Sequence, residues 1–106
     1  MSQVSRVLVA GAGIGGLCAA LALAKQGMKA VVLEQAEQLG EVGAGLQISP
    51  NAFKVLRQLG LESELTPFAF VPQQAVIRDY KTGEYYLRSA LGSAAEVRYD
   101  APYWHL

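Results

Sequence analysis

Three glycines near the N-terminus have the spacing that binding of a phosphate group would need. Gly11, Gly13 and Gly16 fall at the G-x-G-x-x-G positions of the segment Gly11-Ala12-Gly13-Ile14-Gly15-Gly16. In such a turn the first glycine permits a sharp change of direction, and the second leaves room for a pyrophosphate beside the backbone. The third lets a helix pack closely on a strand. All six residues are therefore candidate contacts of an anion.

An acidic side chain follows at the distance that the same kind of site requires. Glu34 comes about 20 residues further along the chain, where a carboxylate can accept hydrogen bonds from ribose hydroxyls. Its negative charge would also disfavour a phosphate on the ribose. The glycines and this carboxylate together predict a dinucleotide-binding site. A glycine-rich turn without a ligand is the alternative.

The elements that would hold these residues are a strand, a helix and a second strand. Residues 6–10 are β-rich with almost no polar alternation, which predicts a strand buried on both faces of a parallel sheet. An Ala- and Leu-rich helix should run to about Gln26, with Gly27 just past its C-terminus. Residues 29–34 form the second predicted strand. The N-terminal N–H groups and the dipole of the helix would favour an anion at the turn.

Composition narrows the class of protein. The chain has 106 residues and a formal net charge of zero, so neither nucleic acid nor an anionic membrane surface is an expected partner. Cys18 is the only cysteine, which excludes an internal disulfide and fits a reducing, cytoplasmic compartment. We expect no metal site. The uncharged run from Val7 to Ala24 could be read as a membrane span or a secretory signal, but glycines interrupt it, and the strand-turn-helix explains their spacing better.

The stretch after Glu34 favours FAD over NAD. A polar, glycine-containing loop occupies residues 35–49, where an NAD domain would usually reach its third strand. A helix follows, with Ser49 as its predicted cap, Pro50 at its first position and Gly60 at its end. Its predicted apolar stripe comprises Ala52, Phe53, Val55, Leu56 and Leu59.

Residues 41–52, with the sequence Glu-Val-Gly-Ala-Gly-Leu-Gln-Ile-Ser-Pro-Asn-Ala, resemble a known family. Together with Leu56 and Leu59-Gly60-Leu61, they are similar to the single-component FAD-dependent aromatic hydroxylases, in particular the salicylate and 3-hydroxybenzoate hydroxylases. That family joins a strand-turn-helix FAD site to a Gly-Ala-Gly loop and a Pro-Asn-Ala helix start. The resemblance spans the chain and is densest from Val7 to Leu61.

The resemblance implies an α/β fold, with a Rossmann-like β-α-β FAD-binding unit followed by the truncated start of a β-sheet substrate domain. The implied division places residues 1–66 in the FAD-binding domain and residues 67–106 in the substrate domain.

The resemblance also implies roles for individual residues. Residues 11–16 would cradle the FAD pyrophosphate, and Glu34 would hold the adenosine ribose. Gln35, where relatives often carry Arg, would lie beside the adenosine. Ala44, in the Gly-Ala-Gly loop, would lie close to the flavin, although turn geometry alone explains the loop glycines equally well. For Gln47, a side chain facing a ring pocket and a solvated loop amide both remain open, and the second is preferred.

The implied reaction is hydroxylation of a phenolic or other aromatic ring with NAD(P)H and O₂. No residue of this chain is a candidate catalyst, so we expect the chain to be inactive by itself. Two other classes stay open: another FAD-dependent oxidoreductase, of the amine oxidase or reductase type, and a non-enzymatic dinucleotide-binding module.

The last third of the chain predicts β-structure. Residues 74–80 and 84–88 flank Lys81-Thr82-Gly83, so a hairpin is expected, with a positive φ at Gly83. Its three tyrosines could line an aromatic pocket, but cross-strand pairs on a half-buried face are the preferred interpretation. They are Tyr80, Tyr85 and Tyr86.

Residues 101–106 predict an unpaired strand in which His105 is a strand residue without a catalytic role. In the resembling family, a His-Arg-x-x-Leu motif would begin just after Leu106. We therefore expect the chain to be a fragment of a longer protein. Exposed sheet edges would then favour a homo-oligomer or association with other chains.

Overall fold

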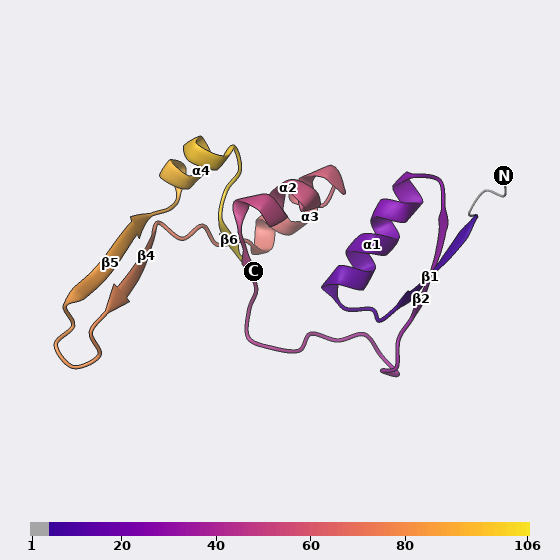
Figure 1. Cartoon of the computed structure of the whole chain (residues 1–106), viewed down its shortest axis with the longest axis horizontal. Helices are drawn as coiled ribbons and strands as arrows, with labels where there is room; N and C mark the ends of the chain where they lie inside the picture. The colour runs from indigo at the N-terminus through magenta and orange to yellow at the C-terminus, as the bar shows by residue number, and fades with distance from the viewer. Residues whose placement is uncertain (1–4) are drawn as a thin grey trace. The chain divides into compact units, whose positions relative to one another are not determined.

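The computed structural model describes residues 5–106, which fall into two compact units divided between Gly43 and Ala44. Figure 1 shows the helices and strands of both. The chain is a mixed α/β protein, as predicted. The expected boundary between the domains of the complete fold, after residue 66, remains a prediction.

The first unit is a β-α-β arrangement. Strand β1 (Arg6–Ala10) pairs in parallel with β2 (Lys29–Leu33), in a register that places Leu8 beside Val31. Helix α1 (Ile14–Lys25) connects the two strands and packs on them. It ends as predicted, because Gly27 adopts a φ of 77° and the Met28 N–H donates to the Leu23 carbonyl over 3.0 Å.

The prediction that β1 is buried on both faces is wrong within this unit. Leu8 remains 61% exposed, and Ile14 of α1 is 60% exposed. The physical reason is that a pair of strands carrying a single helix has one covering layer, whereas a parallel sheet buries its strands between two.

The second unit is built around a small aromatic core. Five of its elements are β3 (Gln47–Ile48), α2 (Pro50–Gln58), α3 (Glu62–Leu65), the 3-10 helix η1 (Thr66–Phe68) and β6 (Trp104–His105). The core comprises Ile48, Phe53, Ala101 and Trp104. The rings of Phe53 and Trp104 meet edge to face, with centroids 4.6 Å apart.

Helix α2 begins and ends where the sequence predicts, with two differences in detail. Pro50 is its first residue, and Gly60 ends it with a φ of 78°. Ser49 occupies the N-cap position, but its hydroxyl donates to the Asn51 side chain and accepts no hydrogen bond from the main chain of the helix. The prediction that Ser49 caps the helix through its side chain is therefore wrong. The predicted stripe is buried at Phe53 and half-buried at Leu56 and Leu59, whereas Ala52 and Val55 are exposed.

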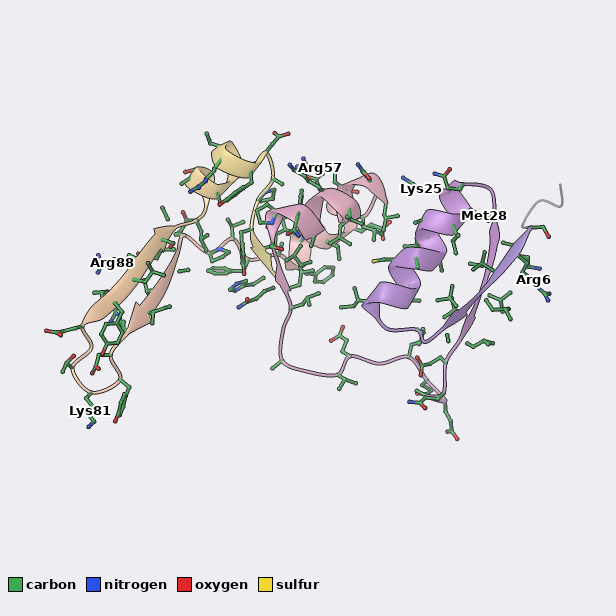
Figure 2. All side chains as sticks on the ribbon, in the orientation of Figure 1. Arg6, Lys25, Met28, Arg57, Lys81 and Arg88 are labelled. Carbon is green, nitrogen blue, oxygen red and sulfur yellow. The ribbon has the colours of Figure 1, made fainter. Side chains whose placement is uncertain are left out.

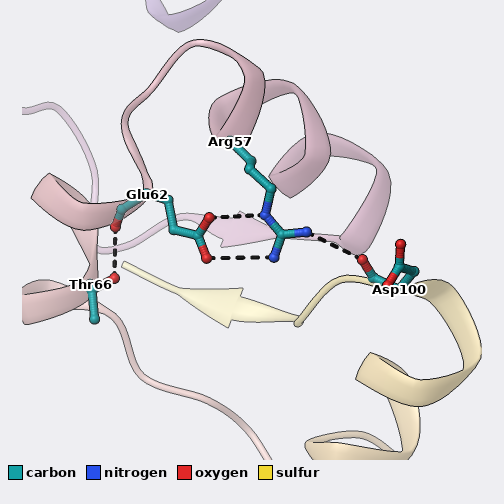
Figure 3. Close-up of polar contacts among 4 residues, drawn as sticks. All are labelled: Arg57, Glu62, Thr66 and Asp100. Carbon is teal, nitrogen blue, oxygen red and sulfur yellow. Dashed lines mark hydrogen bonds and ion pairs between the residues drawn. The ribbon is translucent and has the colours of Figure 1, made fainter.

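An ion pair connects α2 to the segments that follow it (Figure 3). Arg57 Nε lies 2.9 Å from Glu62 Oε2 at the start of α3, and the guanidinium also donates to the Asp100 carbonyl over 3.4 Å. Asp100 is the only non-glycine residue among residues 5–106 with a positive φ. The chain leaves α4 (Ser93–Tyr99) through this residue. This helix is not among the elements that the sequence pattern predicts.

The final strand is paired, which corrects the prediction of an unpaired strand. β6 pairs antiparallel with β3, so that His105 lies opposite Gln47 and Trp104 lies opposite Ile48. Main-chain hydrogen bonds between Leu46 and Leu106 extend the pair. His105 is a strand residue, as predicted.

The predicted hairpin is present as β4 (Gln74–Arg78) and β5 (Tyr85–Ala90), with a φ of 75° at Gly83. The expectation of a half-buried face is wrong, because every residue of both strands is exposed and Tyr80 is 88% exposed. Figure 2 shows side chains standing away from both sides of this hairpin, with Lys81 near its tip. Nothing within the second unit forms a layer over either face.

Polar contacts stabilise the hairpin in place of a core. Tyr85 lies opposite Arg78, and the guanidinium carbons of Arg78 and Arg88 lie 4.0 and 3.5 Å from the centre of its ring. At the turn, Asp79 accepts hydrogen bonds from the Tyr86 hydroxyl and from main-chain N–H groups. The Tyr86 hydroxyl is the largest of the influences that lower the pKa of Asp79 to about 2.

Candidate nucleotide-binding site

The turn between β1 and α1 has the geometry that its glycines predict. Gly11 adopts a φ of 100°, and its N–H donates to the Leu33 carbonyl over 2.6 Å, which joins the turn to the end of β2. At Gly16, a β-carbon would lie 1.9 Å from the Gly11 carbonyl oxygen and 3.4 Å from Val9 Cγ1. Since no side chain fits there, Gly16 sets how closely α1 approaches the strands.

Gly13 is different, because its surroundings are open. It occupies the N-cap position of α1 with extended backbone, and a β-carbon built on it would meet no atom within 4 Å. Ile14 and Gly15 are exposed beside it, and Ala12 is half-buried. The glycine therefore leaves space on the outer side of the turn, as a backbone that admits a phosphate requires.

The start of α1 supplies main-chain donors to this space. The first helical hydrogen bond back to the turn runs from the Leu17 N–H to the Gly13 carbonyl, over 2.9 Å. The N–H groups that precede Leu17 in the first turn of a helix have no partner within the helix, and the helix dipole adds positive potential at this end. An anion beside Gly13 would be stabilised both by these N–H groups and by the helix dipole.

Glu34 lies next to the turn, although it is far away in the sequence. Its carboxylate accepts a hydrogen bond from the Ala12 N–H over 2.8 Å and another from the Ala36 N–H over 3.0 Å. Both bonds lower the pKa of Glu34 below its ordinary value, and the bond from Ala36 has the larger effect. The group is an exposed anion near neutral pH, positioned to accept hydrogen bonds from hydroxyl groups.

We expect Glu34→Gln to weaken ADP binding about tenfold or more, because hydrogen bonds to a charged acceptor are the stronger ones. The amide would also turn an N–H donor toward one of the two main-chain donors. Isothermal titration of both proteins with ADP measures the change. An unchanged affinity would contradict the role of this carboxylate.

The same variant tests the electrostatics of the turn. Because the pKa of Glu34 is lowered on folding, its stabilisation is fully present above the ordinary value of 4.5 and is lost as the pH falls through the lowered value. The chemical shift of the Ala12 amide in NMR spectra should therefore change as the pH falls, with a midpoint below the ordinary carboxyl pKa of 4.5. The transition should be absent from Glu34→Gln.

The two remaining predicted site residues are Gln35, next to Glu34 in the chain, and Ala44, in the second unit. Gln35 is exposed, and its main-chain N–H contributes a further, smaller lowering of the Glu34 pKa. Ala44 begins the second unit and borders a pocket there, next to Gly45, whose φ is 138°. The structure thus brings residues 11–16 and Glu34 together and leaves Ala44 in a separate unit.

One polar group in the second unit was not found from the sequence. The Tyr103 hydroxyl donates to Gln47 Oε1 over 3.2 Å, and the Tyr103 ring meets the His105 ring edge to face with centroids 5.7 Å apart. The only signal for this group is the antiparallel pairing of β3 with β6. That pairing joins segments more than 50 residues apart, and no local pattern predicts it.

A parallel β-α-β unit with an open glycine turn at the helix N-terminus and a carboxylate at the end of the second strand defines a dinucleotide-binding protein of the Rossmann type. The sequence of residues 4–100 matches the family model described as FAD binding domain. The chain belongs to this family, which confirms the predicted FAD-binding fold.

Named relatives agree with this assignment. The chain is 38% identical over 103 residues to 3-hydroxybenzoate 6-hydroxylase of Klebsiella oxytoca, a match that covers 97% of this chain and 26% of the relative. It is also 38% identical over 103 residues to 6-hydroxynicotinate 3-monooxygenase of Pseudomonas fluorescens, covering 97% of this chain and 27% of the relative. The chain therefore spans about a quarter of the length of these relatives. The predicted resemblance to FAD-dependent aromatic hydroxylases is confirmed.

A solved structure shows the same fold. HpxO of Klebsiella pneumoniae, complexed with FAD and uric acid, superimposes with a TM-score of 0.80 at 29% identity. The match covers 95% of this chain and 25% of that protein. Among residues 5–106, no helix combines the length and the apolar character needed to cross a membrane, and α1 has only 12 residues.

Proposed function

We propose that this chain is the FAD-binding portion of a flavoprotein monooxygenase that hydroxylates an aromatic ring with NAD(P)H and O₂. The observation that carries the proposal is the open space at Gly13, which is the N-cap of α1 and follows Ala12, whose N–H donates to the Glu34 carboxylate. The names of the relatives support an aromatic or heteroaromatic acid as the substrate class, with hydroxybenzoates and hydroxynicotinates as examples. Salicylate belongs to the same chemical class.

The residues present fit the adenosine diphosphate part of FAD. The turn Gly11-Ala12-Gly13-Ile14-Gly15-Gly16 would hold the pyrophosphate through main-chain N–H groups, because Gly13 leaves the backbone accessible. Glu34 would accept hydrogen bonds from the ribose hydroxyls, and Gln35 would lie beside the adenosine. Ala44 and its flanking glycines would lie close to the flavin, a role supported by the resemblance in motif.

When bound, FAD supplies the redox and oxygen chemistry of such an enzyme. The contribution of this chain is to bind and orient the cofactor. No side chain of residues 5–106 is proposed as acid, base or nucleophile. Because the chain spans about a quarter of its relatives, we propose that it does not turn over substrate by itself.

The cellular setting is also a proposal. A free thiol at Cys18 supports a reducing, cytoplasmic location. The uncovered strands β4 and β5 support association with further strands, either of the same protein or of a second copy.

The direct test of this function is an absorbance spectrum of the 106-residue chain after incubation with FAD and desalting. We expect a retained flavin band near roughly 450 nm, since the flavin keeps its own chromophore when bound. Riboflavin, which lacks the adenosine diphosphate, serves as the matched control and should be lost on desalting. A folded chain that retains neither compound and does not bind ADP would refute the proposed cofactor site.

A further inference from the structure

The hairpin of β4 and β5 carries two arginines that share one aromatic ring. Arg78 lies opposite Tyr85 in the strand pairing, and Arg88 follows Tyr85 on β5 (Figure 2). The guanidinium carbon of Arg78 is 4.0 Å from the centre of the Tyr85 ring, and that of Arg88 is 3.5 Å from it. One ring therefore holds two positive charges close together.

These two charges have no counter-ion within the hairpin. Across residues 5–106, neither Arg78 nor Arg88 forms an ion pair with a carboxylate. Asp79 follows Arg78 in the chain, but its carboxylate accepts hydrogen bonds from two main-chain N–H groups of the turn and from the Tyr86 hydroxyl. The repulsion between the two guanidinium groups is therefore not offset by a paired acid.

Both arginines are open to a ligand from solvent. Every residue of β4 and β5 is exposed, and no element of the second unit covers either face of the hairpin. Two further charged side chains stand at the turn. The Lys81 ammonium lies 5.5 Å from the centre of the Tyr80 ring, and Glu84 precedes Tyr85. Positive charges outnumber negative ones over residues 78–88.

Two neighbouring guanidinium groups suit a small anion with two charges. Each guanidinium presents a planar fork of N–H donors that matches the oxygens of a phosphate group. A phosphate monoester carries close to two negative charges near neutral pH and has three strong acceptor oxygens. Such a group can accept from both arginines and offset both charges at once.

We propose that Arg78 and Arg88 form a binding site for a phosphate monoester, and that Tyr85 positions the two guanidinium groups. The site belongs to the second unit, whereas the proposed FAD site belongs to the first. It is a site for recognition, and neither arginine is assigned a step in a reaction. The inference goes beyond the proposed function and does not depend on it.

The test is a titration of the 106-residue chain with methyl phosphate at about pH 7.5, with dimethyl phosphate as the comparison. The side-chain Nε–Hε signals of Arg78 and Arg88 in NMR spectra report binding at the hairpin itself. We expect saturable shifts of both signals with methyl phosphate. Dimethyl phosphate, a diester with a single charge, should bind about fivefold or more weakly.

A pH series separates the charge of the ligand from that of the protein. Between about pH 7.5 and about pH 5, the affinity for methyl phosphate should fall about tenfold, because its second pKa is near 6. Sulfate remains a dianion over this range, so its affinity should stay constant. The hairpin turn should remain intact, since its hydrogen bonds, that of Tyr86 first, lower the pKa of Asp79 to about 2.

Variants identify the groups that bind. Arg78→Gln and Arg88→Gln should each weaken methyl phosphate binding about fivefold or more. Arg98→Gln is the matched control, because Arg98 also lies over a tyrosine ring, at 5.3 Å, but without a second arginine. It should bind as the parent protein does.

The positioning role of Tyr85 has its own pair of variants. Tyr85→Leu should weaken methyl phosphate binding, because it removes the ring that holds both guanidinium groups. Tyr85→Phe keeps the ring and should restore most of the affinity. Main-chain amide signals of β4 and β5 show whether each variant keeps the hairpin, so a loss of affinity with unchanged amide signals is the expected result.

NADPH and NADH distinguish two sources of the phosphate group. NADPH carries a ribose 2′-phosphate that NADH lacks. Shifts of the arginine signals with NADPH but not with NADH would identify this phosphate as the ligand, whereas shifts with methyl phosphate and with neither nucleotide would identify a smaller phosphorylated compound. Both results support the site.

The inference is overturned if methyl phosphate does not shift the two arginine signals, or if dimethyl phosphate or NADH binds equally well. It is also overturned if Arg98→Gln weakens binding as much as Arg78→Gln does. FAD retention reports separately on the first unit. A chain that binds methyl phosphate at the hairpin and retains no FAD would therefore contradict the proposed function alone.

Discussion

Gly16→Ala is expected to unfold the β-α-β unit. The new β-carbon would lie 1.9 Å from the Gly11 carbonyl oxygen, a main-chain atom that cannot move without opening the turn. Ordinary overpacking costs about 1–3 kcal/mol, and a contact this short with the backbone should exceed the upper end of that range. Little apolar surface is buried in this unit, so we expect this loss of folding free energy to unfold it.

The chain contains a reporter for each unit. Cys18 is the only cysteine and lies half-buried in α1, so its thiol should be labelled faster when the first unit opens. Trp104 is the only tryptophan and lies in the core of the second, so its fluorescence monitors that unit. Gly16→Ala should accelerate labelling of Cys18 and leave Trp104 emission unchanged.

Gly15→Ala is the matched control. It is also a helical glycine of α1, but its β-carbon would meet no atom within 4 Å. We expect no loss of stability, and a gain of about 0.4–1 kcal/mol from the reduced freedom of the unfolded chain. Equal labelling rates in the two variants would show that close packing at Gly16 is unimportant.

Gly13→Val should abolish FAD retention while the unit stays folded. The backbone at Gly13 is extended and its surroundings are open, so a branched side chain fits the protein but fills the space beside the turn. If a pyrophosphate binds there, the valine side chain and the pyrophosphate cannot occupy the same space. We expect ADP affinity to fall at least about 100-fold.

The measurement combines FAD retention after desalting with ADP titration and Cys18 labelling. Unchanged labelling would show that the fold is intact. Gly40→Val makes a similar change at an open glycine in the loop after β2. This variant should bind FAD and ADP as the parent protein does. A Gly13→Val protein that keeps its full flavin content would mean that the pyrophosphate lies elsewhere.

Local sequence was sufficient for most of the secondary structure and for the turn. Gly11, Gly27, Gly60 and Gly83 each mark a positive φ that the structure contains, because such backbone is strained for side-chain-bearing residues. The motif predicts open surroundings for Gly13 and close packing at Gly16, and the structure shows the same contrast. These features depend on a few neighbouring residues, which is why they can be read from the sequence.

Burial could not be read in this way. The apolar runs of β1 and α1 and the alternation in β4 and β5 indicate which faces are suited to packing, but not whether another layer covers them. Leu8 and Tyr80 are consequently exposed in the structure although the patterns predicted at least partial burial. Burial depends on the presence of other elements, and periodicity carries no information about them.

The sequence by itself determined the strand-turn-helix, the glycine turn and the family, because each is encoded over short distances by residues with special backbone requirements. Only the tertiary structure decided the partners of Glu34 and Gln47. Glu34 meets the Ala12 N–H because β2 pairs in parallel with β1, and Gln47 meets Tyr103 because β6 pairs with β3. Strand pairing brings together residues that are distant in the chain, and it is selected by the packing of the whole unit and not by any local pattern.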